Sequence, residues 1–121
     1  MPEGLTSPGA NVALAALAAA FTWVQRHTGP PGAAGTANVA GDTSRIQVAW
    51  TTPASGAMES QGAVSDVGVT TAEDYTHFSA WSASSGGTCG FTGSITSDPI
   101  TVGQTVTFPA GTFDTSFPLA S

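Results

Sequence analysis

Few side chains in this sequence could carry out chemistry. They are two histidines, His27 and His77, the single cysteine Cys89, and the adjacent carboxylates Glu73 and Asp74. A catalytic nucleophile needs a base beside it on the same face of a cleft, and a third group that orients this base. Cys89 and His77 fall on neighbouring strands of one predicted hairpin, which does not by itself supply such a grouping. We therefore expect no catalytic residues and a protein that is not an enzyme.

The same residues do not predict a cofactor or a metal site. Asp74, His77 and the distant His27 could offer ligand atoms, but their spacing does not favour zinc over chance. A single cysteine excludes an intramolecular disulfide and a zinc site built on repeated cysteines. We interpret His77 as a hydrogen-bonded packing residue. We expect the ring nitrogens of His27 to fasten the loop that follows it.

The three tryptophans are the residues that could bind a sugar, because a flat aromatic ring can stack on the apolar face of a sugar. Trp50 fits a core position, since it continues the strand face of Ile46 and Val48. Trp81 is open: it could face a second sheet, a partner subunit or a carbohydrate. A carbohydrate-binding module for host adhesion, with a host-surface glycan as its partner, predicts that Trp81 is exposed in a groove with polar neighbours.

The chain has unusually little charge. Only 8% of its 121 residues are charged, with two arginines and no lysine against eight carboxylates. The net charge of −6 leaves no basic patch to neutralise phosphates, so nucleic acid is not an expected partner. Because assembly interfaces are depleted in Lys, Glu and Asp, the deficit favours a surface that faces other subunits, and hence a homo-oligomer. The alternative is a small β protein rich in Thr, Ser and Gly from a GC-rich genome.

The N-terminal region predicts an arm followed by one helix. Residues 1–9 read as an extended arm, in which Ser7 and Pro8 offer a cap and a first-turn proline. The spacing of Leu14, Leu17 and Phe21 predicts a helix at about residues 10–21. This apolar run is too short to cross a bilayer, and the acidic start of the chain is unlike a secretion signal, so no membrane partner is expected.

The rest of the chain alternates as short strands do. Strands are predicted at 22–27 and 45–50, with a long loop at 29–43 between them, and a hairpin turns at 84–87. On the first hairpin strand Phe78 and Ala80 share one face, and His77 and Trp81 share the other. Many short strands between turns predict a single mainly β domain over residues 10–121, a small antiparallel β-sandwich (Ig-like or jelly-roll-like) with one N-terminal helix. Its expected core contains Phe78, Phe91, Ile95, Val106 and Phe108.

The second hairpin strand is predicted beyond the turn at 84–87. Alternation places Cys89, Phe91 and Ile95 on one face of this strand. Ser97-Asp98-Pro99 is expected to end it, because proline interrupts the hydrogen bonding of a sheet.

Several blocks of the sequence resemble small virion proteins of tailed phages that infect actinobacteria. One block is Trp23–Gly32, with His27-Thr28-Gly29 inside it, and it follows an alanine-rich helix. A second is Thr76–Trp81, followed by Gly86-Gly87-Thr88, and the similarity spans about Ala10 to Leu119. The chain departs from this group at three positions: Arg26 stands for a leucine, Pro30 for an aspartate and Ser79 for a glycine.

The resemblance implies a structural protein of the virion that is made in the host cytoplasm. Such proteins are minor tail or tail-fibre-like proteins, or accessory subunits that decorate and stabilise a capsid. The implied partners are other virion proteins, either major capsid or tail proteins, and the choice between capsid and tail stays open. The expected docking segments are the N-terminal arm and the long loop, with contact residues Trp81, His27, Pro30, Pro31 and Trp23.

Overall fold

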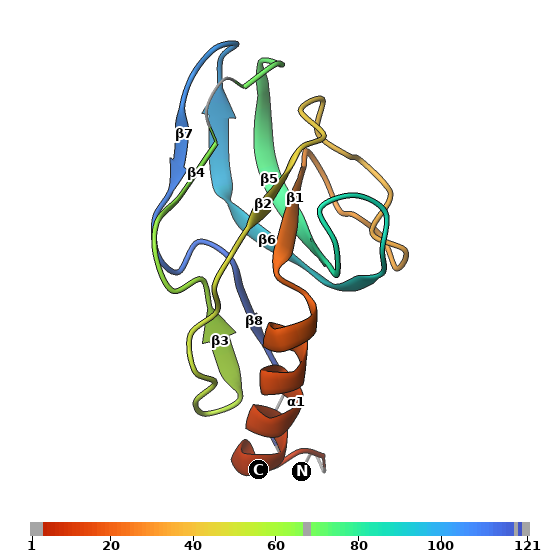
Figure 1. The fold of residues 1–121 in the computed structure, drawn as a ribbon, viewed down its shortest axis with the longest axis vertical. Coiled ribbons are helices and arrows are strands. Elements are labelled where there is room, and N and C mark those ends of the chain that lie inside the picture. The colour runs from red at the N-terminus through yellow and green to blue at the C-terminus, as the bar shows by residue number, and fades with distance from the viewer. Residues whose placement is uncertain (1–3, 67–68, 118, 120–121) are drawn as a thin grey trace.

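The protein folds as a small antiparallel β-sandwich with one N-terminal helix, as the sequence predicts. The structure, a computed structural model, describes residues 4–66, 69–117 and 119. Over these residues the elements are α1 (Ser7–Ala20), β1 (Trp23–His27), β2 (Arg45–Gln47), β3 (Ala57–Glu59), β4 (Val64–Asp66), β5 (Glu73–Trp81), β6 (Cys89–Ile100), β7 (Val106–Phe108) and β8 (Asp114–Ser116). Figure 1 shows the helix at one end of the molecule, beyond the four-stranded sheet and beside β3.

Helix α1 starts three residues before its predicted start at residue 10. Thr6 has an extended backbone at the N-cap position, and Pro8 lies in the first turn, where its missing N–H is no loss. Residues 7–9 therefore belong to the helix and not to an extended arm, while residues 1–3 of that arm lie outside the described residues. The helix ends at Ala20, and the N–H of Phe21 donates to the Leu17 carbonyl. Ala10 and Leu14 are its buried residues.

The four-stranded sheet has the order β2-β1-β5-β6, and its neighbours are antiparallel. The central pair aligns Trp23 with Trp81 and His27 with His77. Strands β5 and β6 form the predicted hairpin. However, β6 continues through Pro99 to Ile100, so the prediction that Ser97-Asp98-Pro99 ends the strand is wrong. Strand β6 is at the edge of the sheet, where proline is tolerated because its missing N–H need not pair with a further strand.

A β-bulge at the start of β6 corrects a second prediction. Ala80 pairs with Phe91, but Trp81 pairs with Cys89, so one additional residue of β6 lies between these pairs. Because directly paired residues share a face, Cys89 lies on the face of Trp81 and Phe91 on the face of Ala80. Cys89 and Phe91 therefore do not share a face as strict alternation predicts.

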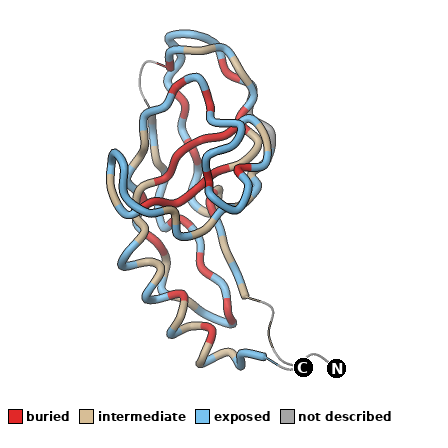
Figure 2. The backbone as a smooth tube through the Cα atoms, turned by 90° about the vertical axis from the view of Figure 1, so that its right-hand side faces the viewer, coloured by how far each residue is buried: buried red, intermediate tan, exposed pale blue. Residues whose placement is uncertain are grey.

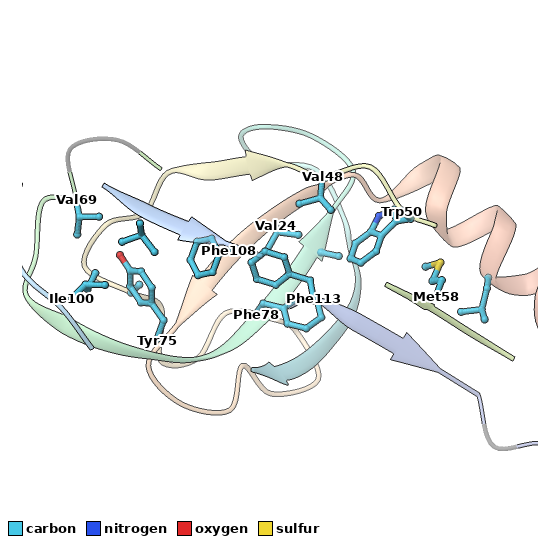
Figure 3. Packing of buried hydrophobic residues seen from close by; sticks show 14 residues of the cluster. Val24, Val48, Trp50, Met58, Val69, Tyr75, Phe78, Ile100, Phe108 and Phe113 are labelled. Atoms are coloured by element: carbon cyan, nitrogen blue, oxygen red, sulfur yellow. The ribbon is translucent and has the colours of Figure 1, made fainter. Parts of the chain in front are cut away.

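The second layer consists of two short ribbons, β4-β7 and β3-β8. Between the layers an aromatic cluster forms the centre of the core, as Figure 3 shows. Phe78 and Phe113 have ring centroids 5.2 Å apart, and Phe108 and Phe113 have centroids 5.1 Å apart. Of the predicted core residues, Phe78, Val106 and Phe108 are buried, and Phe91 and Ile95 pack partly buried against them. Trp50 is also buried, as predicted.

Candidate functional site

Several polar and aromatic side chains of β1 and β5, His27 among them, lie on the face of the four-stranded sheet that points away from the core. We call this the outer face and define it by Trp23, Gln25, His27, Ser79 and Trp81. Strand pairing joins these residues across β1 and β5, opposite Val24 and Phe78 in the core. Gln25, His27, Ser79 and Trp81 are all buried. The predicted separation of His77 and Trp81 from Phe78 and Ala80 is thus confirmed.

A chain of hydrogen bonds crosses the outer face. The Trp81 indole Nε1–H donates to Ser79 Oγ at 2.7 Å, and Ser79 Oγ lies 2.7 Å from His27 Nε2. His27 Nδ1 lies 2.8 Å from the Ala37 carbonyl oxygen. A carbonyl only accepts, so the Nδ1–H of His27 donates to it; Nε2 then accepts from the Ser79 hydroxyl. Every polar group in this chain has a partner when His27 is neutral.

Burial favours this neutral form of His27. The side chain is 0% exposed. Desolvation lowers the pKa of His27 below its ordinary value of 6.5, although the carbonyl of Ala37 opposes the shift. The imidazole is therefore held as a neutral hydrogen-bonding element. It fastens the loop that follows it, as the sequence predicts, and it is not placed as a base in an open cleft.

The predicted long loop, residues 29–43, covers the outer face. Its ends are tied to the sheet, because Thr28 N–H donates to Asn38 O at 2.9 Å and Ala40 N–H to Arg26 O at 3.1 Å. At its middle, Gly35 has a φ of +72° and lies directly against Cys89 and Trp81. In Figure 1 this segment is the orange to yellow loop beside β1. The loop is thus packed on its own domain, one of the two roles expected of so long a connection.

Both arginines make contacts within the domain. Arg45 lies over the Trp81 ring at 4.2 Å and donates to the carbonyls of Ala83 at 2.8 Å and Gly86 at 2.6 Å. Arg26 is 0% exposed and donates to Ser44 Oγ at 2.7 Å, with Asp42 at 3.4 Å. The guanidinium groups therefore fix the β5-β6 turn and the end of the loop.

The predicted contact residues are not one exposed patch. His27, Pro31 and Trp81 are buried, Trp23 is half-buried and Pro30 is exposed. Trp81 is only 8% exposed, so the expectation of an exposed Trp81 in a groove is wrong. Contact of these five residues with a partner stays a prediction. His27 and Trp81 would support such a surface from beneath it.

The cysteine and the second histidine are not brought together. His77 pairs with Ser94, whereas Cys89 pairs with Trp81, four residues further along β5. At about 3.3 Å per residue this separates the pairs by roughly 13 Å. Desolvation raises the pKa of the Cys89 thiol above its ordinary value of 9.0, which disfavours the nucleophilic thiolate. Among the described residues, no group of three His, Cys, Asp or Glu side chains could hold a metal ion.

Sequence reasoning missed Ser79, Arg45 and Gly35 as organising residues. Ser79 is one small polar residue between Phe78 and Ala80, and its position beside His27 depends on the β1-β5 register. The one signal in the sequence was that a serine stands at position 79, where the resembling phage proteins have a glycine. Arg26 was a similar signal, because its buried guanidinium stands where that group has a leucine.

A groove of about 750 Å³ runs between β6 and the segment that joins β7 to β8. Hydroxyl groups of Ser94, Thr96 and Thr112 and the carboxylate of Asp114 line it. Phe108 also borders it, but this side chain is 1% exposed and lies within the aromatic core. The groove therefore offers hydroxyls and one acid, without the flat aromatic ring that sugar stacking requires.

Comparison with known proteins identifies the family of this chain. The family described as "Podophage GP4 fiber I protein gp80" matches residues 10–116, and no curated protein shows significant similarity. The described part of the chain contains no helix that is long and apolar enough to cross a membrane. The matched segment includes most of α1, both layers of the sandwich and the covering loop. The chain therefore belongs to this phage fibre family.

Proposed function

We propose that this member of the phage fibre family is a structural subunit of the tail fibre of a podophage, and that it acts by contact and not by catalysis. The family match over residues 10–116 carries the proposal. It favours the tail over the capsid surface, the two locations that the sequence alone left open. Other tail proteins of the virion are then its expected partners.

The geometry supports a contact role. The side chains with chemical potential, His27, Ser79 and Trp81, are joined to one another inside the domain. They stiffen the packing of the long loop on the sheet, since a fully satisfied polar network specifies one arrangement. A rigid sandwich with a projecting helix suits a subunit that must hold its neighbours in fixed positions.

The alternative, a carbohydrate-binding adhesion module, required an exposed tryptophan on which a sugar could stack. Trp50 and Trp81 are each 8% exposed, and sugar stacking needs an open aromatic face. No specific observation now favours a host-surface glycan as the ligand of these two residues.

Copy number tests the proposed location. Quantitative mass spectrometry of purified particles would compare this chain with the major capsid protein. A fibre subunit should be present in far fewer copies than the capsid protein. A number of copies comparable to that of the capsid protein would indicate a shell-decorating subunit and contradict the proposal, and absence from the particle would contradict any virion role.

A further inference from the structure

Strand β6 forms an open edge of the four-stranded sheet. It comes last in the order β2-β1-β5-β6, so within this sheet it pairs with β5 alone. The inner strands β1 and β5 are buried over continuous stretches, which Figure 2 shows in red in the middle of the body. Strand β6 instead alternates between exposed and half-buried residues from Gly90 to Thr96. Its free edge is therefore accessible to solvent.

The hydrogen bonds of β1 fix the directions of the backbone groups across the sheet. Ala40 N–H donates to Arg26 O and Val48 N–H donates to Thr22 O, so the even-numbered residues around β1 bond away from β5. Hydrogen bonding alternates along antiparallel strands. The odd-numbered residues of β1 therefore bond to β5, and the even-numbered residues of β5 bond to β6.

The same alternation identifies the free backbone groups of β6. Phe78 pairs with Gly93, so Gly93 bonds inward to β5. Its neighbours Thr92 and Ser94 must then direct their N–H and C=O groups outward, away from the sheet. Within the part of the chain that the structure describes, no backbone group bonds to them. An edge with such unpaired groups is a template for the strand of another chain.

The open edge is short. The register between β5 and β6 shifts before Phe91 and again after Ser94. Only residues 91–94 keep regular pairing with β5 between these two irregularities, and bulges are features that prevent an edge from pairing further. The edge therefore accommodates one short extended segment, whose selection must depend on what lies beside the edge.

The groove of about 750 Å³ lies beside this edge and carries negative charge. Ser94 lines it on one side and Asp114 on the other. Asp114 pairs with Glu59 across β3 and β8, and both side chains are exposed. Because Ser60 N–H donates to Phe113 O, the adjacent Glu59-Asp114 pair is a non-hydrogen-bonded pair, in which the two side chains lie closest.

Two carboxylates directly opposite each other destabilise a ribbon unless a cation lies between them. Neither arginine of this chain supplies that cation. Arg26 lies beside Asp42, and Arg45 lies over the ring of Trp81. The charge of the groove therefore complements a cationic side chain from another molecule.

We propose that residues 91–94 of β6 bind an extended segment of a different protein as an added strand, and that a cationic side chain of this segment lies in the groove against Asp114 and Glu59. Main-chain hydrogen bonds to Thr92 and Ser94 supply affinity, and the carboxylates supply specificity. An extended segment can make both contacts, because its backbone meets the edge while alternate side chains point toward the groove. This inference goes beyond the proposed function and holds wherever in the particle the chain lies.

Short blocked peptides test the added strand. The probe is acetyl-Thr-Val-Arg-Val-Thr-amide, titrated into the isotope-labelled full chain and followed through the backbone amide signals in NMR spectra. We expect the signals of Thr92 and Ser94 to shift as the peptide is added. A peptide with glutamate in place of arginine should bind more weakly. A form of the arginine peptide that is methylated at every backbone nitrogen should not bind, because it cannot donate to the edge.

Asp114→Asn tests the cationic contact. It should weaken binding of the arginine peptide about two- to fivefold, the effect of losing one exposed ion pair. The variant should stay folded, because it relieves the repulsion between Asp114 and Glu59. Asp74→Asn is the matched control. It removes the same charge roughly 10 Å along β5 from His77, the residue that pairs with Ser94, and should bind the peptide like the wild type.

Three results would overturn the inference. They are unchanged signals of Thr92 and Ser94 at millimolar peptide, equal binding of the methylated peptide, and equal binding by the wild type and D114N. Raising the protein concentration without peptide tests a second copy as the occupant. Shifts of the same two signals in that experiment would show that the edge pairs with another copy of this chain, and would overturn the inference as well.

Discussion

At the scale of single residues, Ser79 is the side chain on which the candidate site depends. Its hydroxyl accepts from Trp81 and donates to His27, so it joins two rings from different strands. All three side chains are at most 8% exposed. A buried polar group without a partner is costly. Replacing any one of the three side chains leaves another without its hydrogen bond and should therefore destabilise the protein.

Removing the Ser79 hydroxyl should therefore destabilise the protein without changing its surface. In Ser79→Ala both Trp81 Nε1–H and His27 Nε2 lose their partner, and we expect a loss of about 1–3 kcal/mol in the free energy of unfolding. Urea denaturation measures it. The matched control is Ser84→Ala, an exposed serine in the β5-β6 turn, which should change stability by less than about 0.5 kcal/mol. Equal effects of the two substitutions would contradict the network.

Stability should also depend on pH through His27. Its pKa is lower in the folded state than its ordinary value of 6.5, so the unfolded chain binds more protons below that pH. The free energy of unfolding is therefore highest above pH 6.5 and falls as the pH drops through 6.5 toward the folded-state pKa. Urea denaturation between pH 7.5 and 5.5 should show this decline in the wild type. His27→Gln should be less stable but flatter over the same range, and an unchanged slope would refute the assignment.

The residue-scale predictions from sequence were right where the cause was local. His27 fastens its own loop because the partner, Ala37, lies only 10 positions away. The sequence alone does not place Trp81, because its surroundings come from far along the chain: the Arg45 guanidinium and the Gly35 backbone. Those contacts follow from strand register, which no local pattern specifies.

At the scale of elements, the loop of residues 29–43 forms a third layer over the outer face. At Gly35 the loop packs closely on this face, and an added Cβ would lie 2.5 Å from Cys89 Sγ and 3.3 Å from Trp81. Real Cβ contacts are not this short, so packing here requires a glycine. The same residue needs a positive φ of +72°, which favours glycine independently.

A comparison of Gly35 with Gly86 separates the requirement for close packing from the requirement for a positive φ. Gly86 has a similar φ of +65° but no atom within 4 Å of an added Cβ. Gly86→Ala should therefore cost only the backbone strain, about 1–2 kcal/mol. In Gly35→Ala the added methyl group also overpacks against Cys89 and Trp81. This should lower the free energy of unfolding by roughly a further 1–3 kcal/mol. Thermal or urea unfolding of both variants measures the difference. If Gly35→Ala is no worse than Gly86→Ala, the loop does not pack as described.

The helix, the core-facing strand residues and the hairpin could be predicted because their signals are local. These signals are the apolar spacing of a helix, the alternation of a strand and the residues of a turn. The bulge at Gly90 could not be read in this way. It moves Cys89 to the outer face, and Gly90 itself lies against the ring of Phe21, far away in sequence. The helix start was missed by three residues because the Pro/Gly-rich composition of residues 7–9 suggested a loop, although Pro8 lies in the first turn, where a helix tolerates it.

At the scale of the whole molecule, charge and apolar surface are separated. Among the described residues the carboxylates lie on strands of the sandwich and on its loops, whereas residues 4–25, which include helix α1, carry no charge. Both arginines serve internal contacts.

The central claim is that this chain is a structural part of the tail fibre. The most direct measurement is immunogold electron microscopy of purified phage particles, with antibody fragments raised against the full folded chain. The account predicts gold at the tail fibres and none on the shell. Gold distributed over the capsid surface would contradict it.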